Sequence, residues 1–198
     1  KNKDIIVIEN GIDTNYFNRK SKKYTTRTII FVGNMSYKPN VIAAKFICEK
    51  IFPLVKQKVE NTKVIIAGSN PNNEVKKLSR LDKNIKITGF ITDIRDAYLK
   101  GSVFIAPMFI GSGLQNKLLE AMSMKIPCIT TDLANKSLNA TKKEIMIAEN
   151  EEEFAEKCIA LFNNKEKTLN LIENGYKFVK SKYDWKKSTS KIIKLLKS

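Results

Sequence analysis

The stretch GSGLQNKLLEAMSMKIPCITT, residues 111–131, joins a glycine-rich turn to a segment of helical character and then to an apolar run of strand length. Such a succession is typical of one strand-to-helix unit in an α/β fold. Amide groups at a helix start lack intrahelical partners and lie at the positive end of the helix dipole, so Gly111, Ser112 and Gly113 are predicted to approach an anion closely. The alternative is that the glycines only permit a tight turn.

Glu120 follows Gly113 by seven residues. In one continuous helix this spacing spans roughly 10 Å along the axis and returns to almost the same face. We therefore predict that this face holds phosphates at its start and a ribose diol on the carboxylate. Alternatively, Glu120 is a solvent-exposed carboxylate that pairs with Lys117 or Lys125 on the same helix. Lys117 itself is either a surface lysine or a phosphate contact.

The same alternation of strand and helix extends outward in both directions. Apolar runs of strand length lie at residues 28–33, 63–68, 85–90, 103–107, 127–131 and 144–148. Helical segments are predicted from Pro39 to about Val55 and at about 73–80, 94–100, 114–124, 151–162 and 165–181. The near-continuous β-branched runs indicate strands covered on both sides. The sequence thus predicts an α/β fold with a doubly wound, mostly parallel, six-stranded Rossmann-like sheet and helices on both faces.

Binding sites in such sheets lie at the carboxyl ends of the strands. This rule places Gly33, Gly68, Gly89 with Phe90, and the loop 108–113 on one rim of the sheet. Asp93 is expected to cap the following helix, and the alternative is a ligand contact. Asn10, Gly11 and Asp13 are expected to form a turn that enters the domain, with a substrate contact as the alternative, and Trp185 is expected to pack.

Three regions are expected along the chain. Residues 1–27 read as an inter-domain linker that leads into the domain, residues 28–182 as the Rossmann-like domain, and residues 183–198 as an amphipathic basic helix. The chain begins with Lys1 rather than Met, so we expect it to be a piece of a longer protein. The apolar stripe of the last helix either packs on the protein itself or docks on a membrane or another domain.

The formal net charge of +16 raises the question of a polyanionic partner. Only four of the 36 basic residues are arginine, however, and base readout and bidentate phosphate clamps favour arginine. Solvated lysine faces explain the charge, and an anionic membrane surface or an acidic partner remains the alternative. No nucleic acid is expected.

Several function classes are excluded by residues that the sequence lacks. It contains no His, which excludes Ser-His-Asp, Cys-His and imidazole-zinc chemistry within these 198 residues. It contains no Walker loop, and no Gly-x-Gly-x-x-Gly follows its first strand, so NTPase and NAD-dependent functions are only weakly supported. The three cysteines lie far apart in apolar segments, so disulfides are not expected and a reducing cytoplasm fits best. No apolar run is long enough to cross a bilayer.

Six motifs occur in an order that resembles the carboxyl-terminal half of group 1 glycosyltransferases. They are VIENGIDTNYF (7–17), FVGNMSYKPNV (31–41), VIIAGSNP (64–71), ITGFITDIRDAY (87–98), APMFIGSGLQNKLLEAMSMKIPCITT (106–131) and YDW (183–185). The branch that assembles bacterial envelope polysaccharides carries a similar Gly-x-Gly-x-x-Asn-Lys-x-Leu-Glu-Ala-Met core, which includes Asn116. The resemblance implies one half of a retaining GT-B enzyme.

The resemblance also assigns roles to residues. Glu120 matches the second Glu of the family's Glu-x7-Glu motif, which takes the ribose hydroxyls, whereas Ser112 stands in place of the first Glu. The loop amides of Gly111, Ser112, Gly113 and Leu114 would then meet the pyrophosphate or the sugar.

The loop after the first strand also departs from the family pattern. Asn34, after Gly33, stands about where many relatives have an Arg that neutralises the diphosphate. This leaves Lys38 and Lys117 as the candidate catalytic cations. Phe90 and Ile91 match the segment that receives the base, although Phe90 would equally suit core packing.

The implied activity is transfer of a hexose-type sugar from a nucleoside-diphosphate-sugar to a saccharide or lipid-linked acceptor. The donor is a substrate, and neither a cofactor nor a bound metal is implied. The other Rossmann-like half would bind the acceptor, and the enzyme would act in the cytoplasm, peripherally at the inner membrane face. The alternative function is a stand-alone nucleotide- or polyanion-binding module without catalysis.

Overall fold

The computed structural model describes residues 8, 10–19, 27–111 and 113–197. The strands are β1 (Thr28–Val32), β2 (Lys63–Ala67), β3 (Ile85–Ile87), β4 (Val103–Ala106), β5 (Cys128–Thr130) and β6 (Met146–Ile147). The α-helices are α1 (Lys38–Phe46), α2 (Phe52–Lys58), α3 (Asn73–Lys77), α4 (Arg95–Leu99), α5 (Asn116–Ser123), α6 (Asp132–Leu138), α7 (Glu151–Asn163), α8 (Lys165–Lys182) and α9 (Trp185–Lys197). A π-helical turn, η1 (Ile47–Ile51), joins α1 to α2, and a 3-10 turn, η2 (Leu78–Arg80), follows α3.

The six strands form one parallel sheet in the order β3-β2-β1-β4-β5-β6. Every residue of the central strands β1 and β4 is buried, because helices cover both faces of the sheet. The predicted fold class is therefore confirmed. The chain order reverses between β1 and β4, and a crevice at such a switch point is the usual place for a ligand in this class of sheet.

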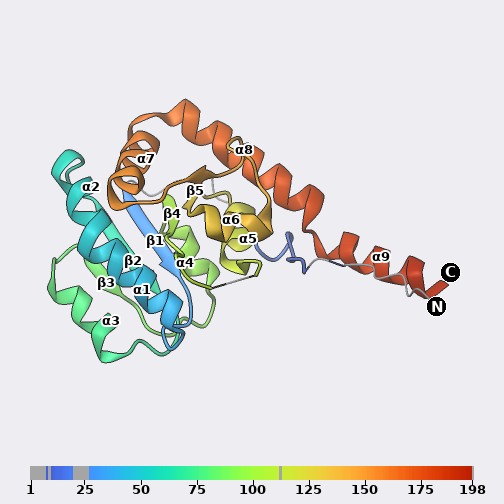
Figure 1. The fold of residues 1–198 in the computed structure, drawn as a ribbon, viewed down its shortest axis with the longest axis horizontal. Helices are drawn as coiled ribbons and strands as arrows, with labels where there is room; N and C mark the ends of the chain where they lie inside the picture. The colour runs from blue at the N-terminus through green and yellow to red at the C-terminus, as the bar shows by residue number, and fades with distance from the viewer. Residues whose placement is uncertain (1–7, 9, 20–26, 112, 198) are drawn as a thin grey trace.

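Helices lie on both faces of the sheet (Figure 1). Helix α7 packs on α2, η1, β4 and β5, whereas α5 packs on β5 and α8. Right-handed crossovers account for the opposite faces of α2 and α5, since the connections that lead from β1 toward β3 and those that lead from β4 toward β6 run in opposite directions across the sheet. Helix α7 follows the last strand and packs on α2.

Two local features differ from the expected helices. The segment read as one helix from Pro39 to Val55 contains η1, in which the N–H of Phe52 donates to the carbonyl of Ile47. Pro53 follows at once and has no N–H to donate, which accounts for the local loss of the regular ladder. Helix α6 is absent from the predicted list of helices, because it is short and mostly polar.

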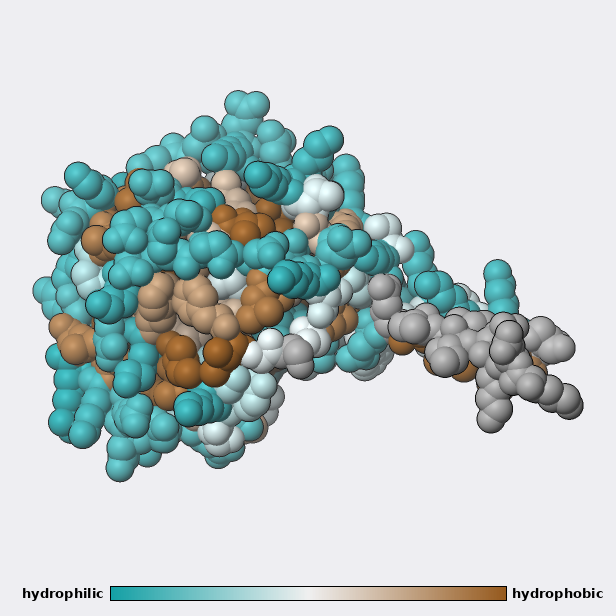
Figure 2. Space-filling view, viewed as in Figure 1, coloured by the Kyte–Doolittle hydropathy of each residue, from teal (hydrophilic) through white to brown (hydrophobic). Residues whose placement is uncertain are grey.

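The last helix extends away from the body as an arm (Figure 1). Its base is held by the segment before β1: the N–H of Ile12 donates to the carbonyl of Tyr183 at 2.8 Å, and the N–H of Trp185 donates to the carbonyl of Ile12 at 3.0 Å. The Thr14 hydroxyl also bonds to the carboxylate of Asp184. Figure 2 shows apolar side chains along the underside of the arm and hydrophilic ones above them. The exposed apolar residues of α9 are Trp185, Ile192, Ile193, Leu195 and Leu196.

Candidate functional site

The loops that follow β1, β2 and β3 are joined at the carboxyl edge of the sheet. The N–H of Met35 donates to the carbonyl of Ser69 at 2.8 Å, and the N–H of Gly68 donates to the carbonyl of Gly89 at 3.1 Å. A Cβ atom at Gly68 would lie 1.8 Å from the carbonyl oxygen of Gly33, so only glycine permits this approach. The predicted rim thus exists, and its loops are fixed to one another.

The loop after β4 lies against the first turn of α1. A Cβ atom at Gly111 would lie 3.5 Å from the hydroxyl of Tyr37, which precedes Lys38. Gly111 and Gly113 have φ angles of +106° and +87°, a region that favours glycine. Ser112 lies outside the described residues.

The predicted helix start at residue 114 is wrong, because α5 begins at Asn116 with Gln115 as its N-cap. With positive φ angles, Gly111 and Gly113 cannot belong to the first helical turn. The argument that Gly113 and Glu120 share one helix face therefore fails. The glycine amides belong to a loop that precedes the helix, and Leu114 in this loop packs on the core.

Lys117 is held at this edge of the sheet by three neighbours. Its Nζ atom donates to Oδ1 of Asn40, lies 3.8 Å from the sulfur of Met108 and lies 5.0 Å from the centre of the Phe31 ring. Burial lowers the pKa of Lys117 from 10.5 to about 8, although the nearby Glu120 carboxylate opposes the change. Lys117 is therefore a half-buried cation and not a solvated surface lysine.

Glu120 is also half-buried, and Tyr98 is its hydrogen-bond partner. The hydroxyl of Tyr98 donates to Oε2 of Glu120 at 2.7 Å. Burial raises the pKa of Glu120, while the Tyr98 hydrogen bond and the Lys117 charge act in the opposite direction. Tyr98 is fully buried, and burial followed by the Glu120 charge raises the pKa of its hydroxyl, which keeps it a donor. The position of Glu120 does not fit a solvated carboxylate on an exposed helix face.

A cavity of about 380 Å³ opens beside Glu120. It is lined by Asn10, Gly11, Ile12, Asp13, Tyr16, Phe17, Asn116, Glu120 and Trp185. The Asn10 amide reaches the side-chain oxygen of Asn116 at 3.5 Å across it. The turn at residues 10–13, for which a substrate contact was the alternative, therefore shares a cavity with Glu120, and so does Trp185, which was expected to pack. In the sequence, the three segments that line this cavity belong to the motifs at 7–17, 106–131 and 183–185, and the joint occurrence of these motifs was the signal that they lie together.

Arg95 connects the loop after β3 with this cavity. Its guanidinium pairs with Asp93, stacks at 3.9 Å from the centre of the Tyr16 ring and donates to the carbonyl of Tyr16 at 3.2 Å. Asp93 was expected to cap this helix, but the N-cap of α4 is Ile94, and the Asp93 carboxylate instead accepts from the N–H of Arg95 at 3.0 Å just before it. The Arg95 guanidinium holds the pKa of Asp93 below its ordinary value.

The remaining predicted residues lie on the rim. Phe90 is 76% exposed, which contradicts core packing, and Ile91 is half-buried against the core. Asn34 and Lys38 are exposed. The side-chain oxygen of Asn34 accepts from the N–H of Ser36 at 3.0 Å, so Asn34 shapes the loop after β1.

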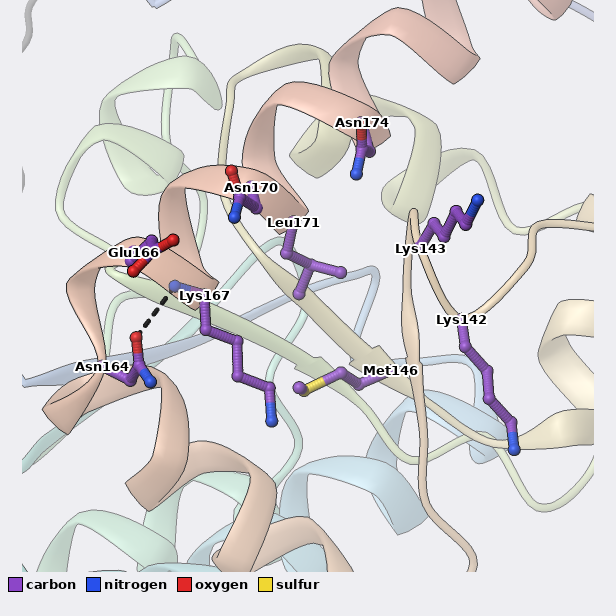
Figure 3. Close-up of a pocket in the computed structure, with 9 residues that line it drawn as sticks. All are labelled: Lys142, Lys143, Met146, Asn164, Glu166, Lys167, Asn170, Leu171 and Asn174. Atoms are coloured by element: carbon purple, nitrogen blue, oxygen red, sulfur yellow. Dashed lines mark hydrogen bonds between the residues drawn. The ribbon is translucent and has the colours of Figure 1, made fainter.

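A second hollow, of about 370 Å³, lies away from these residues (Figure 3). Lys142 and Lys143 come before β6, at the amino edge of the sheet, and line this hollow together with Met146 of β6 and Leu171 of α8. Of its lining residues only Leu171 is buried. Among the described residues, no group of three or more His, Cys, Asp or Glu side chains is arranged to hold a metal.

The parallel sheet and its helices define a Rossmann-like domain, and the carboxyl-edge loops with the half-buried Lys117 and Glu120 form its candidate site near the topological switch point. The sequence model of the family described as "Glycosyl transferases group 1" matches residues 26–164. This chain belongs to that family.

Other comparisons agree with this family. The chain is 29% identical over 176 residues to an uncharacterized 44.6 kDa protein in the cps region of Klebsiella pneumoniae, covering 84% of this chain and 45% of that protein. Anabaena HepE in complex with UDP and glucose superposes with a TM-score of 0.80 at 16% identity, covering 98% of this chain and 56% of HepE. The C-terminal domain of Francisella tularensis LpcC, a group 1 family glycosyl transferase, has a TM-score of 0.68 at 21% identity, covering 88% of this chain and 100% of that one. The chain thus spans about half the length of its curated relative and of HepE.

Proposed function

We propose that this chain is the donor-binding half of a retaining glycosyltransferase that uses a nucleoside-diphosphate-sugar. The observation that carries the proposal is the pair on α5: a half-buried Lys117 faces the loop after β1, and a half-buried Glu120 faces a cavity three residues later. Solved structures of the same fold are described as complexes with UDP, among them HepE and Staphylococcus aureus TarM. TarM superposes with a TM-score of 0.75 at 18% identity.

The proposed roles follow the order of groups in the donor. Phe90 and Ile91 receive the base, Glu120 accepts hydrogen bonds from the ribose hydroxyls, and the loop around Gly111 and Gly113 meets the diphosphate or the sugar. Tyr98 supports Glu120, because its hydroxyl occupies one carboxylate oxygen and leaves the other for the ribose.

Lys117 and Lys38 are proposed to act on the leaving group. As the bond between the sugar and the diphosphate breaks, negative charge develops on the diphosphate oxygens. A cation that is already in place stabilises this charge without reorganisation, and a half-buried site strengthens the effect. No bound metal or cofactor is required in this proposal.

The acceptor is proposed to be a saccharide or a lipid-linked saccharide bound by another Rossmann-like half. The curated relative from a cps region supports a role in envelope polysaccharide assembly. Such an enzyme would act in the cytoplasm at the inner face of the membrane. Helix α9, with five lysines, no acidic residue and an exposed apolar stripe, is a candidate contact with the other half or with an anionic membrane surface.

A second function, from another class, is a non-catalytic nucleotide- or polyanion-binding module. The net charge of +16 favours this function, because lysine-rich surfaces bind polyanions without a preformed binding pocket. Such binding falls steeply with salt and does not depend on Glu120.

Calorimetric titration with UDP, GDP and ADP tests the first function. Glu120→Gln keeps an oxygen for the Tyr98 hydroxyl and removes the charge, so we expect binding of the preferred nucleotide to weaken about tenfold or more, a loss of about 1.4 kcal/mol. Glu156→Gln, an exposed substitution on α7, is the matched control and should bind as the wild type does.

Heparin titration across a range of salt concentrations tests the alternative. Salt-sensitive heparin binding without any nucleotide response would favour the polyanion-binding module. Equal nucleotide affinities for wild type, Glu120→Gln and Glu156→Gln would contradict the proposed ribose site.

A further inference from the structure

Asn40, the third residue of α1, is a buried polar residue in contact with Lys117. It is 5% exposed and lies one helical turn from the loop after β1. Its Nδ2 atom donates to the carbonyl of Asn34 at 2.9 Å, and its Oδ1 atom accepts from Nζ of Lys117. Because an ammonium only donates and a carbonyl only accepts, this network allows one orientation of the amide. Asn40 therefore joins the loop after β1 to the cation on α5.

The residues around Asn40 leave space for its amide and offer the Lys117 ammonium few other partners. A Cβ atom at Gly33 would lie 2.7 Å from Nδ2 of Asn40, so glycine at this position leaves the space that the amide occupies. The other neighbours of the Lys117 ammonium are the Phe31 ring and the sulfur of Met108, which are weak partners for a charge. Within the described part of the chain, the oxygen atom that contacts this ammonium belongs to Asn40.

We propose that Asn40 is a positioning residue that holds the Lys117 ammonium at the carboxyl edge of the sheet for the donor diphosphate without itself neutralising the charge. The inference rests on the proposed function for the identity of the anion. An amide side chain suits this task better than the carboxylate of aspartate or the apolar side chain of leucine, which are of similar size. An aspartate would neutralise the ammonium and repel the Asn34 carbonyl, and a leucine would leave both partners without a hydrogen bond.

The other groups that face Lys117 do not replace Asn40. Glu120, on the same helix, is the acidic neighbour that acts on the Lys117 charge. The Tyr98 hydroxyl, from α4, is 3.4 Å from the Lys117 carbonyl and bonds to Glu120. Phe31 from β1 and Met108 after β4 do not titrate. A substitution at residue 40 should therefore change the pKa of Lys117 directly.

NMR titration of lysine side chains, labelled with ¹³C and ¹⁵N and assigned with Lys117→Arg, tests the link between the two residues without any ligand. Asn40→Asp should raise the pKa of Lys117 by at least about one pH unit, and Asn40→Leu should lower it. Asn135→Asp is the matched control, because Asn135 also fixes a loop through its amide but does so at Ala140, beyond α6. An unchanged Lys117 pKa in both Asn40 variants would overturn the proposal and leave Asn40 with a purely structural role.

UDP titration at pH 7 tests the consequence for the diphosphate. Asn40→Asp should weaken UDP binding about tenfold or more, because the cation is then paired internally. Asn40→Leu should weaken it as well, and Asn135→Asp should not. If the wild type and Asn135→Asp bind UDP and both Asn40 variants bind equally well, this inference fails while the proposed function stands. If the wild type binds no nucleoside diphosphate, the proposed function fails, and the lysine titration still decides whether Asn40 controls Lys117.

Discussion

Lys117 lies where a neutral side chain would be more stable. The lysine loses most of its hydration at the edge of the sheet, and one amide oxygen is its strongest partner. Such a residue lowers the stability of the folded chain when it carries its proton. A site that must bind an anion accounts for a charge in this position.

The pH dependence of stability should reveal this cost. The folded chain releases the Lys117 proton near pH 8, whereas the unfolded chain keeps it to about pH 10.5. The unfolded state binds more protons between these values, so the free energy of unfolding should rise with pH there, by up to about 3 kcal/mol from this residue. Below pH 8 the contribution is constant and unfavourable.

Urea denaturation of wild type and Lys117→Met between pH 7 and pH 10 measures the effect. The difference in unfolding free energy between the two proteins cancels the contributions of the buried thiols and of Tyr98. It should shift in favour of the wild type as the pH rises. A difference that stays flat across this range would show that Lys117 keeps its proton in the fold.

Lys117 and Glu120 could be singled out as candidates from their motif, although the helix-face argument for Glu120 fails, whereas the residues that contact them in the fold could not. Lys117 and Glu120 follow a glycine-rich turn at recognisable positions. Asn40 and Tyr98 become partners of these residues only because α1, α4 and α5 converge on one edge of the sheet. Arg95 likewise meets Tyr16 across 79 residues of sequence. No local pattern encodes such distant pairs.

At the scale of elements, Thr131 joins β5, α6 and the loop after β4. Its hydroxyl donates to the carbonyl of Met108 at 2.7 Å and accepts from the N–H of Ala134 at 3.3 Å, which makes it the N-cap of α6. Met108 also contacts Lys117 through its sulfur. One buried hydroxyl therefore helps to fix the strand end from which the loop with Gly111 departs.

Thr131→Val should lower the free energy of unfolding by about 2 kcal/mol, because it removes the helix cap and leaves a buried carbonyl without a donor. Thr131→Ser keeps the hydroxyl and should cost less than half as much. Equilibrium unfolding in urea gives both values. Valine keeps the methyl group and serine keeps the hydroxyl, so a larger loss for Thr131→Ser than for Thr131→Val would mean that the methyl group makes the larger contribution.

Strands were the most predictable elements, because each is a short apolar run bounded by polar residues or glycine. All six predicted strands are present, with β3 ending at Ile87 rather than continuing to Phe90. Helix starts were less predictable. The start of α5 depends on the backbone angles of Gly111 and Gly113, and glycine accepts helical and non-helical angles about equally.

At the scale of the whole molecule, the arm formed by α9 is fixed at its base and exposed along its length. The base is held by the backbone of Ile12 and by the Thr14 bond to Asp184. Beyond it, Ile192, Ile193, Leu195 and Leu196 are each more than 40% exposed. Within the described residues, no helix is long and apolar enough to cross a membrane.

Removing residues 191–198 should therefore leave the body as stable as before, with a change in Tm of less than about 2 °C. Asp184→Ala, which breaks the bond to Thr14 at the base, should lower the Tm by several degrees. Thermal unfolding followed by circular dichroism compares the two variants. A larger loss for the truncation than for Asp184→Ala would show that the apolar stripe is covered in solution.

Trp185, at the base of this arm, also borders the Glu120 cavity, where it packs so closely on Gly11 that a Cβ there would lie 2.7 Å from its ring. It is the single tryptophan of the chain. The protein therefore carries an intrinsic fluorescent probe. The emission of this one indole should change when a ligand occupies the cavity and when a partner contacts the arm, without an attached dye.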